Sequence, residues 1–94
     1  MADAAGMKID AIIVSDTDNV ATCLTDIAAG ADASVMLGKD TFPLRALQAI
    51  PRGHKVAVAP ISTGDAIMKY GEVIGKASAE IDRGAHVHVH NVVD

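Results

Sequence analysis

This chain of 94 residues has almost no aromatic side chains and only one cysteine. Phe42 and Tyr70 are its two aromatic residues, so the core must be built from Val, Ile, Ala, Leu and Met. Such side chains pack in small, flat layers and favour a compact β or α+β domain. Cys23 has no partner for an internal disulfide and lies in an apolar segment, which favours a small core residue over a nucleophile.

Long apolar runs and clustered positive charge are also missing. The longest apolar run near the N-terminus, Ala11 to Val14, is far too short for a signal peptide or a membrane span. We therefore expect a soluble cytoplasmic protein with no membrane partner. A formal net charge of −4, without any basic run interleaved with aromatics, argues against nucleic acid as a partner. The sequence contains no P-loop, dinucleotide-binding fingerprint or nucleophile elbow.

What the chain does contain is a run of histidines at two-residue spacing, His86, His88 and His90. On an extended strand this spacing turns the three imidazoles to one face and Val87 and Val89 to the other, toward a core. Histidine titrates near neutral pH and is the commonest metal ligand, so this face could bind a divalent ion, hold an anion or move protons. A half-buried strand with a solvated polar face explains the same alternation.

The histidine spacing by itself does not predict a self-contained metal site. Strand residues two apart lie about 6.5–7 Å apart at Cα, so adjacent histidines could chelate one ion with modest adjustment, and the outer pair only with strong twist. No second cluster of Cys and His completes a zinc-type ligand set. His86 and His88 are therefore possible metal ligands, and the rest of the ligand set is unknown.

Three copies of an Ile-x-x-Gly motif divide the chain, at residues 27–30, 61–64 and 81–84. In each copy the glycine suits a positive φ and the isoleucine can enter the core. This pattern predicts short strands joined by one-turn helical corners. The strands predicted before these corners cover residues 20–24, 55–59 and 76–79.

Two segments have helical alternatives. Asp18 could cap a helix that continues to Ala29, although Pro60 and the Val/Ile content of the matching repeat oppose a long helix. A short helix is predicted around Leu44 to Ala49, between two prolines.

Two further segments carry side chains that could contact a ligand. His54 and Lys55 directly follow one glycine, and Lys69 and Tyr70 directly precede another. Glycine at these places permits a tight turn or a close approach of the backbone to a bound group. Together with the histidines, these residues could give an acidic protein a local cluster of cations suited to a carboxylate, sulfonate or phosphate. Each is alternatively an ordinary surface or partly buried residue.

The run from Ile50 to Asn91, IPRGHKVAVAPISTGDAIMKYGEVIGKASAEIDRGAHVHVHN, closely resembles the small SAF-type (antifreeze-like, β-clip) domain of the altronate and galactarate dehydratases. The combination of GHK, KYGxxIG and HVHVHN is specific, and the resemblance covers nearly the whole chain after Met7. It implies a mainly β fold, with a single small SAF/β-clip domain over residues 8–94 that has short helical turns. Residues 1–7 are small and without pattern, and we expect them to be disordered.

In that family the domain is fused to a large catalytic domain or is a separate small subunit, and this chain resembles the second arrangement. The resemblance implies a hydro-lyase subunit that acts with a large catalytic dehydratase subunit to remove water from an anionic sugar acid such as D-altronate. The associated metal is iron(II), held mainly by the large subunit. The small subunit of (2R)-sulfolactate sulfo-lyase, which eliminates bisulfite, is a related alternative, but the segment after His90 lacks the longer basic tail of those subunits. A non-catalytic module that binds a sugar acid or assists assembly is the third interpretation.

Matched to the family motif, the candidate catalytic residues are His54, His86 and His88, with acid and base roles unassigned. The candidate substrate contacts are Lys55, Lys69, Tyr70, His90 and Asn91. Both eliminations remove a proton α to a carboxylate and expel a β group, so each needs a base, a cation for the enolate, and an acid or metal for the leaving group. We expect the chain alone to be inactive, with a surface apolar enough for homo-oligomers to form in the partner's absence.

Overall fold

The protein is described by a computed structural model that covers residues 8–94, and these residues form strands and turns without any helix. The strands are β1 (Ala11–Ile13), β2 (Val20–Cys23), β3 (Asp32–Leu37), β4 (Asp40–Arg45), β5 (Lys55–Ala57), β6 (Ala66–Lys69), β7 (Glu72–Ala77), β8 (His86–Val87) and β9 (Val92–Val93). The expected mainly β fold is confirmed. Residues 1–7, for which the sequence predicts disorder, lie outside the described residues. Within residues 8–94, no helix is long and apolar enough to cross a membrane.

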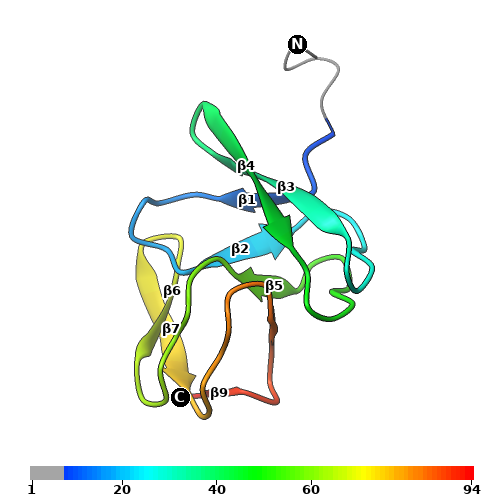
Figure 1. The fold of residues 1–94 in the computed structure, drawn as a ribbon. Coiled ribbons are helices and arrows are strands. Elements are labelled where there is room, and N and C mark those ends of the chain that lie inside the picture. Colours follow the sequence, from blue (N-terminus) through cyan, green and yellow to red (C-terminus); the bar gives the residue numbers. More distant parts are fainter. Residues whose placement is uncertain (1–7) are drawn as a thin grey trace.

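Six strands form one sheet in the order β4-β3-β1-β2-β5-β8, and β6-β7-β9 form a second (Figure 1). Residues of β2 and β5 alternate between two cores. Ala21, Cys23 and Val56 pack in one core. Val20 and Ala57 pack in the other. The central strands are therefore buried on both faces, and their small side chains keep both cores thin.

Four of the loops between the strands contain an Ile-x-x-Gly turn, which we call an isoleucine corner. The sequence analysis found three of these corners. The fourth is Ile50-Pro51-Arg52-Gly53, which has the same Ile-x-x-Gly pattern. The corners pair through antiparallel bridges, Ile27 with Ile50 and Ile61 with Ile81. In each bridge both backbone hydrogen bonds form, at 2.8 to 2.9 Å. All four isoleucines are buried, so each corner contributes one side chain to a core.

The two bridges are built in the same way. The carboxylate before one isoleucine accepts a hydrogen bond from the turn after the other: Asp26 from the N–H of Arg52 at 2.8 Å, and Glu80 from the N–H of Thr63 at 2.7 Å. Each corner glycine has a positive φ and donates its N–H to the carbonyl four residues before the opposite isoleucine. These donor and acceptor pairs are Gly30 to Ala46, Gly53 to Cys23, Gly64 to Ala77 and Gly84 to Ala57.

The predicted one-turn helical corners are wrong, because the glycine N–H bonds to a distant strand instead of a carbonyl within its own turn. The helical alternative for residues 18–29 is also wrong, since β2 occupies part of that segment. The short helix predicted around Leu44 to Ala49 is absent as well. There β4 runs to Arg45, and the N–H of Ala46 donates to Ala31 while the N–H of Leu47 donates to Gly84. Tertiary pairing thus uses the hydrogen bonds that a helix would need.

The histidine run is a strand only in its first part. Strand β8 ends at Val87, and the chain then turns over residues 88–91. Asn91 holds this turn, because its Oδ1 accepts from the N–H of His88 at 2.9 Å and its Nδ2 donates to the carbonyl of His86 at 2.9 Å. Val87 is fully buried, as expected, but Val89 is 82% exposed. The prediction that Val89 faces a core is therefore wrong.

These two valines provide a matched test of the turn. We expect Val87→Ala to lower the free energy of unfolding by roughly 1–3 kcal/mol, because it removes buried methyl groups. Val89→Ala should change it by less than about 0.5 kcal/mol, as surface substitutions usually do. Chemical denaturation of the full chain measures both. Equal losses in the two variants would mean that the strand continues to Val89 and that the turn is misplaced.

Candidate functional site

The first element of the site is His54, which directly precedes β5. The preceding residue, Gly53, has a φ of 85°, and its N–H donates to the carbonyl of Cys23 at 2.8 Å. In return, the N–H of Cys23 donates to the carbonyl of His54 at 2.9 Å. The backbone of His54 is therefore held against the end of β2.

The pairing of β5 with β8 brings distant histidines together. Lys55 pairs with Val87 and Val56 pairs with His86, so the same register places His54 opposite His88. The rings of His54 and His88 stack, with centroids 3.9 Å apart and planes at 15°. Nδ1 of His54 lies 2.8 Å from Nε2 of His86, so one of these nitrogens donates a hydrogen bond to the other.

We call His54, His86 and His88 the histidine cluster. Each offers one ring nitrogen, and these nitrogens all lie within 4.8 Å of one another. Desolvation lowers the pKa of both His86 and His88, and the adjacent His54 lowers both further. Neutral imidazoles are thereby favoured near pH 7, and a neutral imidazole can accept a proton or bind a metal ion. Nδ1 of His88 is buried and has no hydrogen-bond partner.

The three residues predicted as catalytic are thus adjacent in space. The other two residues of the run, His90 and Asn91, lie beside them with different environments. His90 is exposed on the turn, with its ring centroid 5.2 Å from that of His86. Asn91 is buried and uses its amide to hold the turn. Because the amide of Asn91 is used in this way, the geometry does not support its predicted contact with a substrate.

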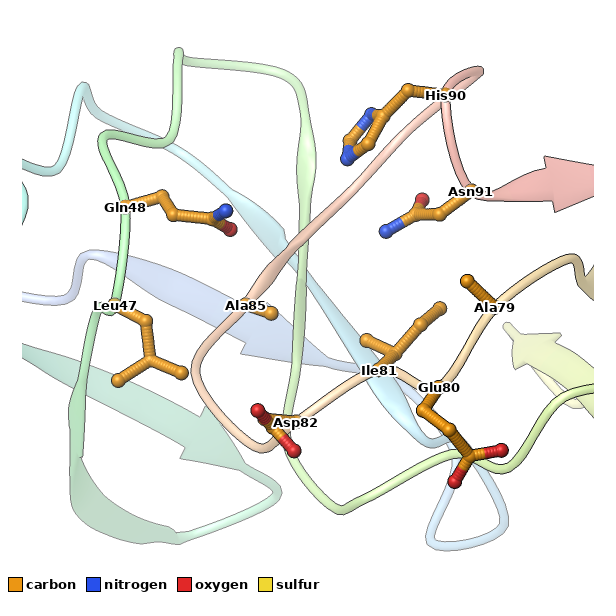
Figure 2. A pocket seen from close by; sticks show the side chains of 9 residues that line it. All are labelled: Leu47, Gln48, Ala79, Glu80, Ile81, Asp82, Ala85, His90 and Asn91. Carbon is orange, nitrogen blue, oxygen red and sulfur yellow. The ribbon is translucent and has the colours of Figure 1, made fainter.

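An open cleft of about 420 Å³ adjoins the histidine cluster. Figure 2 shows Gln48 and His90 pointing toward its centre from opposite sides, with Glu80 and Asp82 at the other end. Gln48 connects the cleft to the cluster, because its Oε1 accepts a hydrogen bond from the N–H of His86 at 2.8 Å. A ligand in this cleft would therefore meet two carboxylates and the imidazole of His90, whereas the three cluster side chains do not line it.

The predicted cations lie together near the cluster. Lys55 is half-buried, and desolvation followed by the charge of Lys69 lowers its pKa. Nζ of Lys69 lies 4.8 Å from the centre of the Tyr70 ring. The hydroxyl of Tyr70 is 3.4 Å from the hydroxyl of Thr22. Thr22 lies on β2, directly opposite Lys55 on β5. Lys55 also lowers the pKa of His86 and His88, so the lysines and histidines interact electrostatically.

The sequence analysis missed Asp18, which positions Tyr70. Tyr70 and Gly71 both have positive φ, 56° and 76°, in the tight turn between β6 and β7. Asp18 accepts hydrogen bonds from the N–H of Tyr70 at 3.0 Å, of Gly71 at 2.8 Å and of Ser15 at 3.1 Å. Desolvation alone would raise its pKa, but these bonds outweigh it and hold the pKa below the ordinary value. Its only sequence signal was that of a helix cap.

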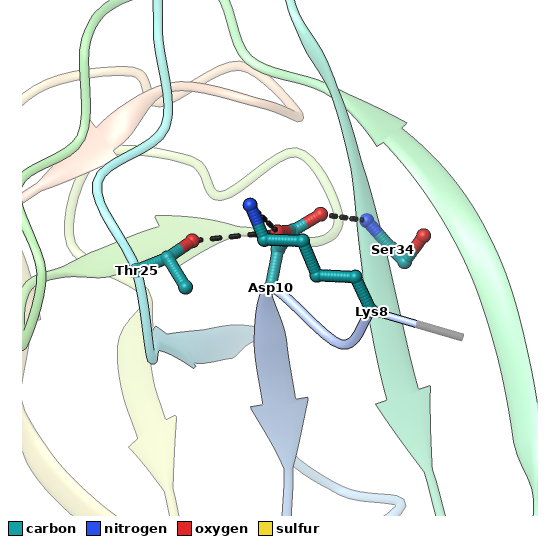
Figure 3. Close-up of polar contacts among 4 residues, drawn as sticks. All are labelled: Lys8, Asp10, Thr25 and Ser34. Atoms are coloured by element: carbon teal, nitrogen blue, oxygen red, sulfur yellow. Dashed lines mark hydrogen bonds and ion pairs between the residues drawn. The ribbon is translucent and has the colours of Figure 1, made fainter. Parts of the chain in front are cut away.

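A separate, part-buried group of polar contacts around Asp10 has a structural role. Figure 3 shows Asp10 accepting hydrogen bonds from the N–H of Ser34 at 2.9 Å and the hydroxyl of Thr25 at 3.3 Å, with Lys8 Nζ at 3.8 Å. These contacts join the start of β1 to β3. Cys23 is buried nearby, and desolvation together with Asp10 raises the pKa of its thiol to about 11. The predicted role of Cys23 as a small core residue is confirmed.

Fold and site define a small all-β domain that presents a cluster of three histidines close to lysines and next to an open cleft. The sequence model of the family described as the altronate/galactarate dehydratase SAF domain matches residues 9–94. The chain belongs to this family, as its resemblance implied.

Several relatives of known name share this domain. The chain is 47% identical over 74 residues to altronate dehydratase of Escherichia coli K12 and 40% identical over 80 residues to that of Bacillus subtilis 168. The two matches include 79% and 85% of this chain, but they span only 14% and 15% of the length of the two dehydratases. It is also 34% identical over 92 residues to (2R)-sulfolactate sulfo-lyase subunit alpha of Chromohalobacter salexigens, covering 92% of this chain and 95% of that subunit.

The role of Asp18 is tested by the pH dependence of stability. Asp18→Ala removes the charged acceptor of three N–H groups, and we expect it to cost about 1–3 kcal/mol at pH 7. Because the pKa of Asp18 is lowered on folding, its contribution is full above the unfolded value near 3.8 and is lost as pH falls through the folded value. Denaturation curves from pH 7 to pH 2 should therefore show the variant and the parent protein converging in acid.

Asp16→Ala is the matched control, since Asp16 is exposed on the same loop. We expect its stability to follow that of the parent protein at every pH. If Asp16→Ala and Asp18→Ala gave the same pH profile, Asp18 would not be the group that holds the hairpin.

Proposed function

We propose that this chain is the small subunit of a two-chain sugar-acid hydro-lyase and that the histidine cluster faces an active site shared with a large subunit. The observation that carries this proposal is the convergence of His54, His86 and His88 from two distant segments. Family membership supports the class of reaction, because the relatives include altronate and galactarate dehydratases.

The chemistry of the cluster suits β-elimination from a polyhydroxy carboxylate. A base must take the proton α to the carboxylate, and the lowered pKa values of His86 and His88 favour the neutral form that accepts a proton. Lys55 and Lys69 provide positive charge for the substrate carboxylate and for the enolate that develops from it. Tyr70 lies beside Lys69 and Thr22, where its hydroxyl can orient the substrate.

A partner subunit is supported by the shape and surface of the chain. The cleft beside the cluster is open, and water must be kept away from a reacting enolate. Large apolar side chains are exposed near the hairpin, with Val14 at 58%, Tyr70 at 48% and Val73 at 61%. The hairpin turn lies against Ser15, so the segments that carry Val14 and Tyr70 meet on one side of the molecule. A large subunit that covers this side would both close the site and bury the apolar surface.

The metal that the family resemblance implies is iron(II), which would polarise the substrate oxygens when bound. Three imidazoles whose ring nitrogens lie within 4.8 Å of one another, with one buried nitrogen that has no partner, are a donor set that fits such an ion. The residues of this chain that would hold it are those of the histidine cluster. A ring nitrogen that bound the ion would not accept a proton, so metal binding and base catalysis are alternative roles for each of these nitrogens.

A second candidate is the small subunit of a (2R)-sulfolactate sulfo-lyase. It is favoured by the match to subunit alpha from Chromohalobacter salexigens, which covers nearly the whole of both chains. The proton abstraction would be the same, and bisulfite would leave in place of water. The site residues named above would then bind a sulfonate as well as a carboxylate.

Reconstitution distinguishes these functions. The chain is co-expressed with the large dehydratase-like protein encoded in the same genome and assayed with D-altronate, galactarate and (2R)-sulfolactate. We expect a stable complex that dehydrates a sugar acid, whereas neither chain alone should turn over. Release of sulfite from sulfolactate would support the second candidate. A complex without turnover on any of the three substrates would contradict a role in catalysis and favour an assembly module.

The histidines are tested in the same complex. We expect His86→Gln and His88→Gln to lower kcat by roughly 100-fold or more, the scale of a lost acid or base. Their thermal melts should stay close to that of the parent protein, because neither side chain belongs to one of the two cores. His90→Gln should have a smaller effect on turnover.

Val87→Ala is the opposite control, since it should lose stability and keep the specific activity of the folded fraction. Full activity in both histidine variants would make this face an ordinary solvated surface. Loss of folding in both would make the imidazoles structural groups.

A further inference from the structure

We propose that the histidine cluster is itself a binding site for a divalent first-row transition metal ion, with His54, His86 and His88 as its protein ligands. This proposal deepens the proposed function, on which its catalytic meaning rests, by assigning metal ligands to this chain as well as to its partner. Binding of the ion itself depends only on the geometry of this chain.

The distances between the donors are close to those of a metal site. Zinc and similar ions bind histidine nitrogens at about 2.0–2.1 Å, so two such nitrogens on one ion lie about 3 Å apart. Nδ1 of His54 and Nε2 of His86 are 2.8 Å apart. A nitrogen of His88 lies within 4.8 Å of both, and rotation of its ring about the side-chain torsions can bring it nearer. These two nitrogens are thus close to the separation that a shared ion needs, and the ion would take the place of the hydrogen that now bonds them.

The unpaired nitrogen of His88 is the second observation. Its Nδ1 is buried without a partner, which is unfavourable for a polar atom removed from water. The backbone around it is otherwise satisfied, since the N–H of His88 bonds to Asn91. A metal ion bound by this ring would fix its orientation and recover part of that cost.

The backbone supports all three ligands independently of any ion. The carbonyl of His54 accepts from the N–H of Cys23, and the N–H of His54 donates to the carbonyl of Pro51. His86 is held by hydrogen bonds to Gln48 and Asn91, and His88 by one to Asn91. Such outer contacts orient metal ligands and reduce the entropy that binding must overcome. The backbone of the site is therefore fixed before an ion arrives, and binding requires the stacked rings to rotate about their side-chain torsions.

The donor set selects the type of ion. Within residues 8–94, the group of metal-capable side chains that lie together consists only of histidines. Imidazole nitrogen suits zinc, cobalt, nickel, copper and iron(II), whereas magnesium and calcium prefer oxygen ligands. Three protein ligands leave positions for water or substrate, which is the arrangement of catalytic metal sites.

The test uses the full chain alone, freed of metal by a chelator. Zinc(II) is titrated by calorimetry, and cobalt(II) by its visible absorption, which becomes stronger when imidazoles replace water in a low-symmetry site. We expect one ion per chain with micromolar or tighter affinity, and no binding of magnesium. His54→Gln and His88→Gln should each weaken zinc binding by at least about 10-fold, judged against the usual scale for changes at metal sites.

His90→Gln is the control for metal affinity, because its ring lies outside the cluster and is tilted by 39° to that of His86. Its affinity for zinc should change less than about threefold. Circular dichroism checks that every variant is folded. Failure to bind either ion, or equal affinity in the parent protein, His54→Gln and His88→Gln, would overturn the proposal.

This result is separable from the proposed function. A chain that binds zinc through the cluster but forms no active complex would leave the metal site standing and remove the hydro-lyase assignment. An active complex whose small subunit binds no metal alone would do the reverse, and would leave the imidazoles as proton-transfer groups.

Discussion

The two isoleucine bridges are the constraint on which the rest of this structure depends. Ile27 with Ile50, and Ile61 with Ile81, tie four loops together in pairs through backbone hydrogen bonds and buried side chains. Each corner then sends the chain into the next strand through a glycine with positive φ. Without these bridges the short strands would have too few ladder bonds of their own to set their registers.

The same corners deliver the histidines to the site. Gly53 ends one corner directly before His54, and Gly84 ends another two residues before His86. Neither glycine is replaceable at low cost, since both have positive φ and a Cβ at Gly84 would clash with the carbonyl oxygen of Arg45. The motif that builds the core is therefore also the motif that positions the cluster. Stability and site geometry are coupled through the register of β5 and β8.

The electrostatics of the site follow from partial burial. Desolvation, followed by the charges of His54 and Lys55 among others, lowers the pKa of His86 and His88, and desolvation with Lys69 lowers the pKa of Lys55. The neutral form of His86 and His88 is therefore favoured near pH 7 in a protein whose formal net charge is −4. Such an environment suits proton acceptance or metal binding better than the permanent capture of an anion by the histidines, and it leaves that role to the lysines.

Much of the candidate site was predictable because its residues are close in sequence or in a specific motif. The run from His86 to His90 and the KYG turn were recognised from spacing and resemblance, and His54 from its place in the GHK motif. Asp18 was not, because it acts on a hairpin about fifty residues away and an aspartate before a short apolar segment equally predicts a helix cap. Its effect exists only after β6 and β7 have formed.

By itself, the sequence determined the mainly β class, the family and the composition of the core, since these depend on local alternation, small apolar side chains and a specific motif. Only the tertiary structure decided that the histidine run turns after Val87, because the amide of Asn91 bonds back to the backbone and leaves Val89 in solvent. It alone also brought His54 opposite His88. That contact comes from the pairing of strands far apart in sequence, and strand register is set by long-range hydrogen bonds and core packing that no local pattern contains.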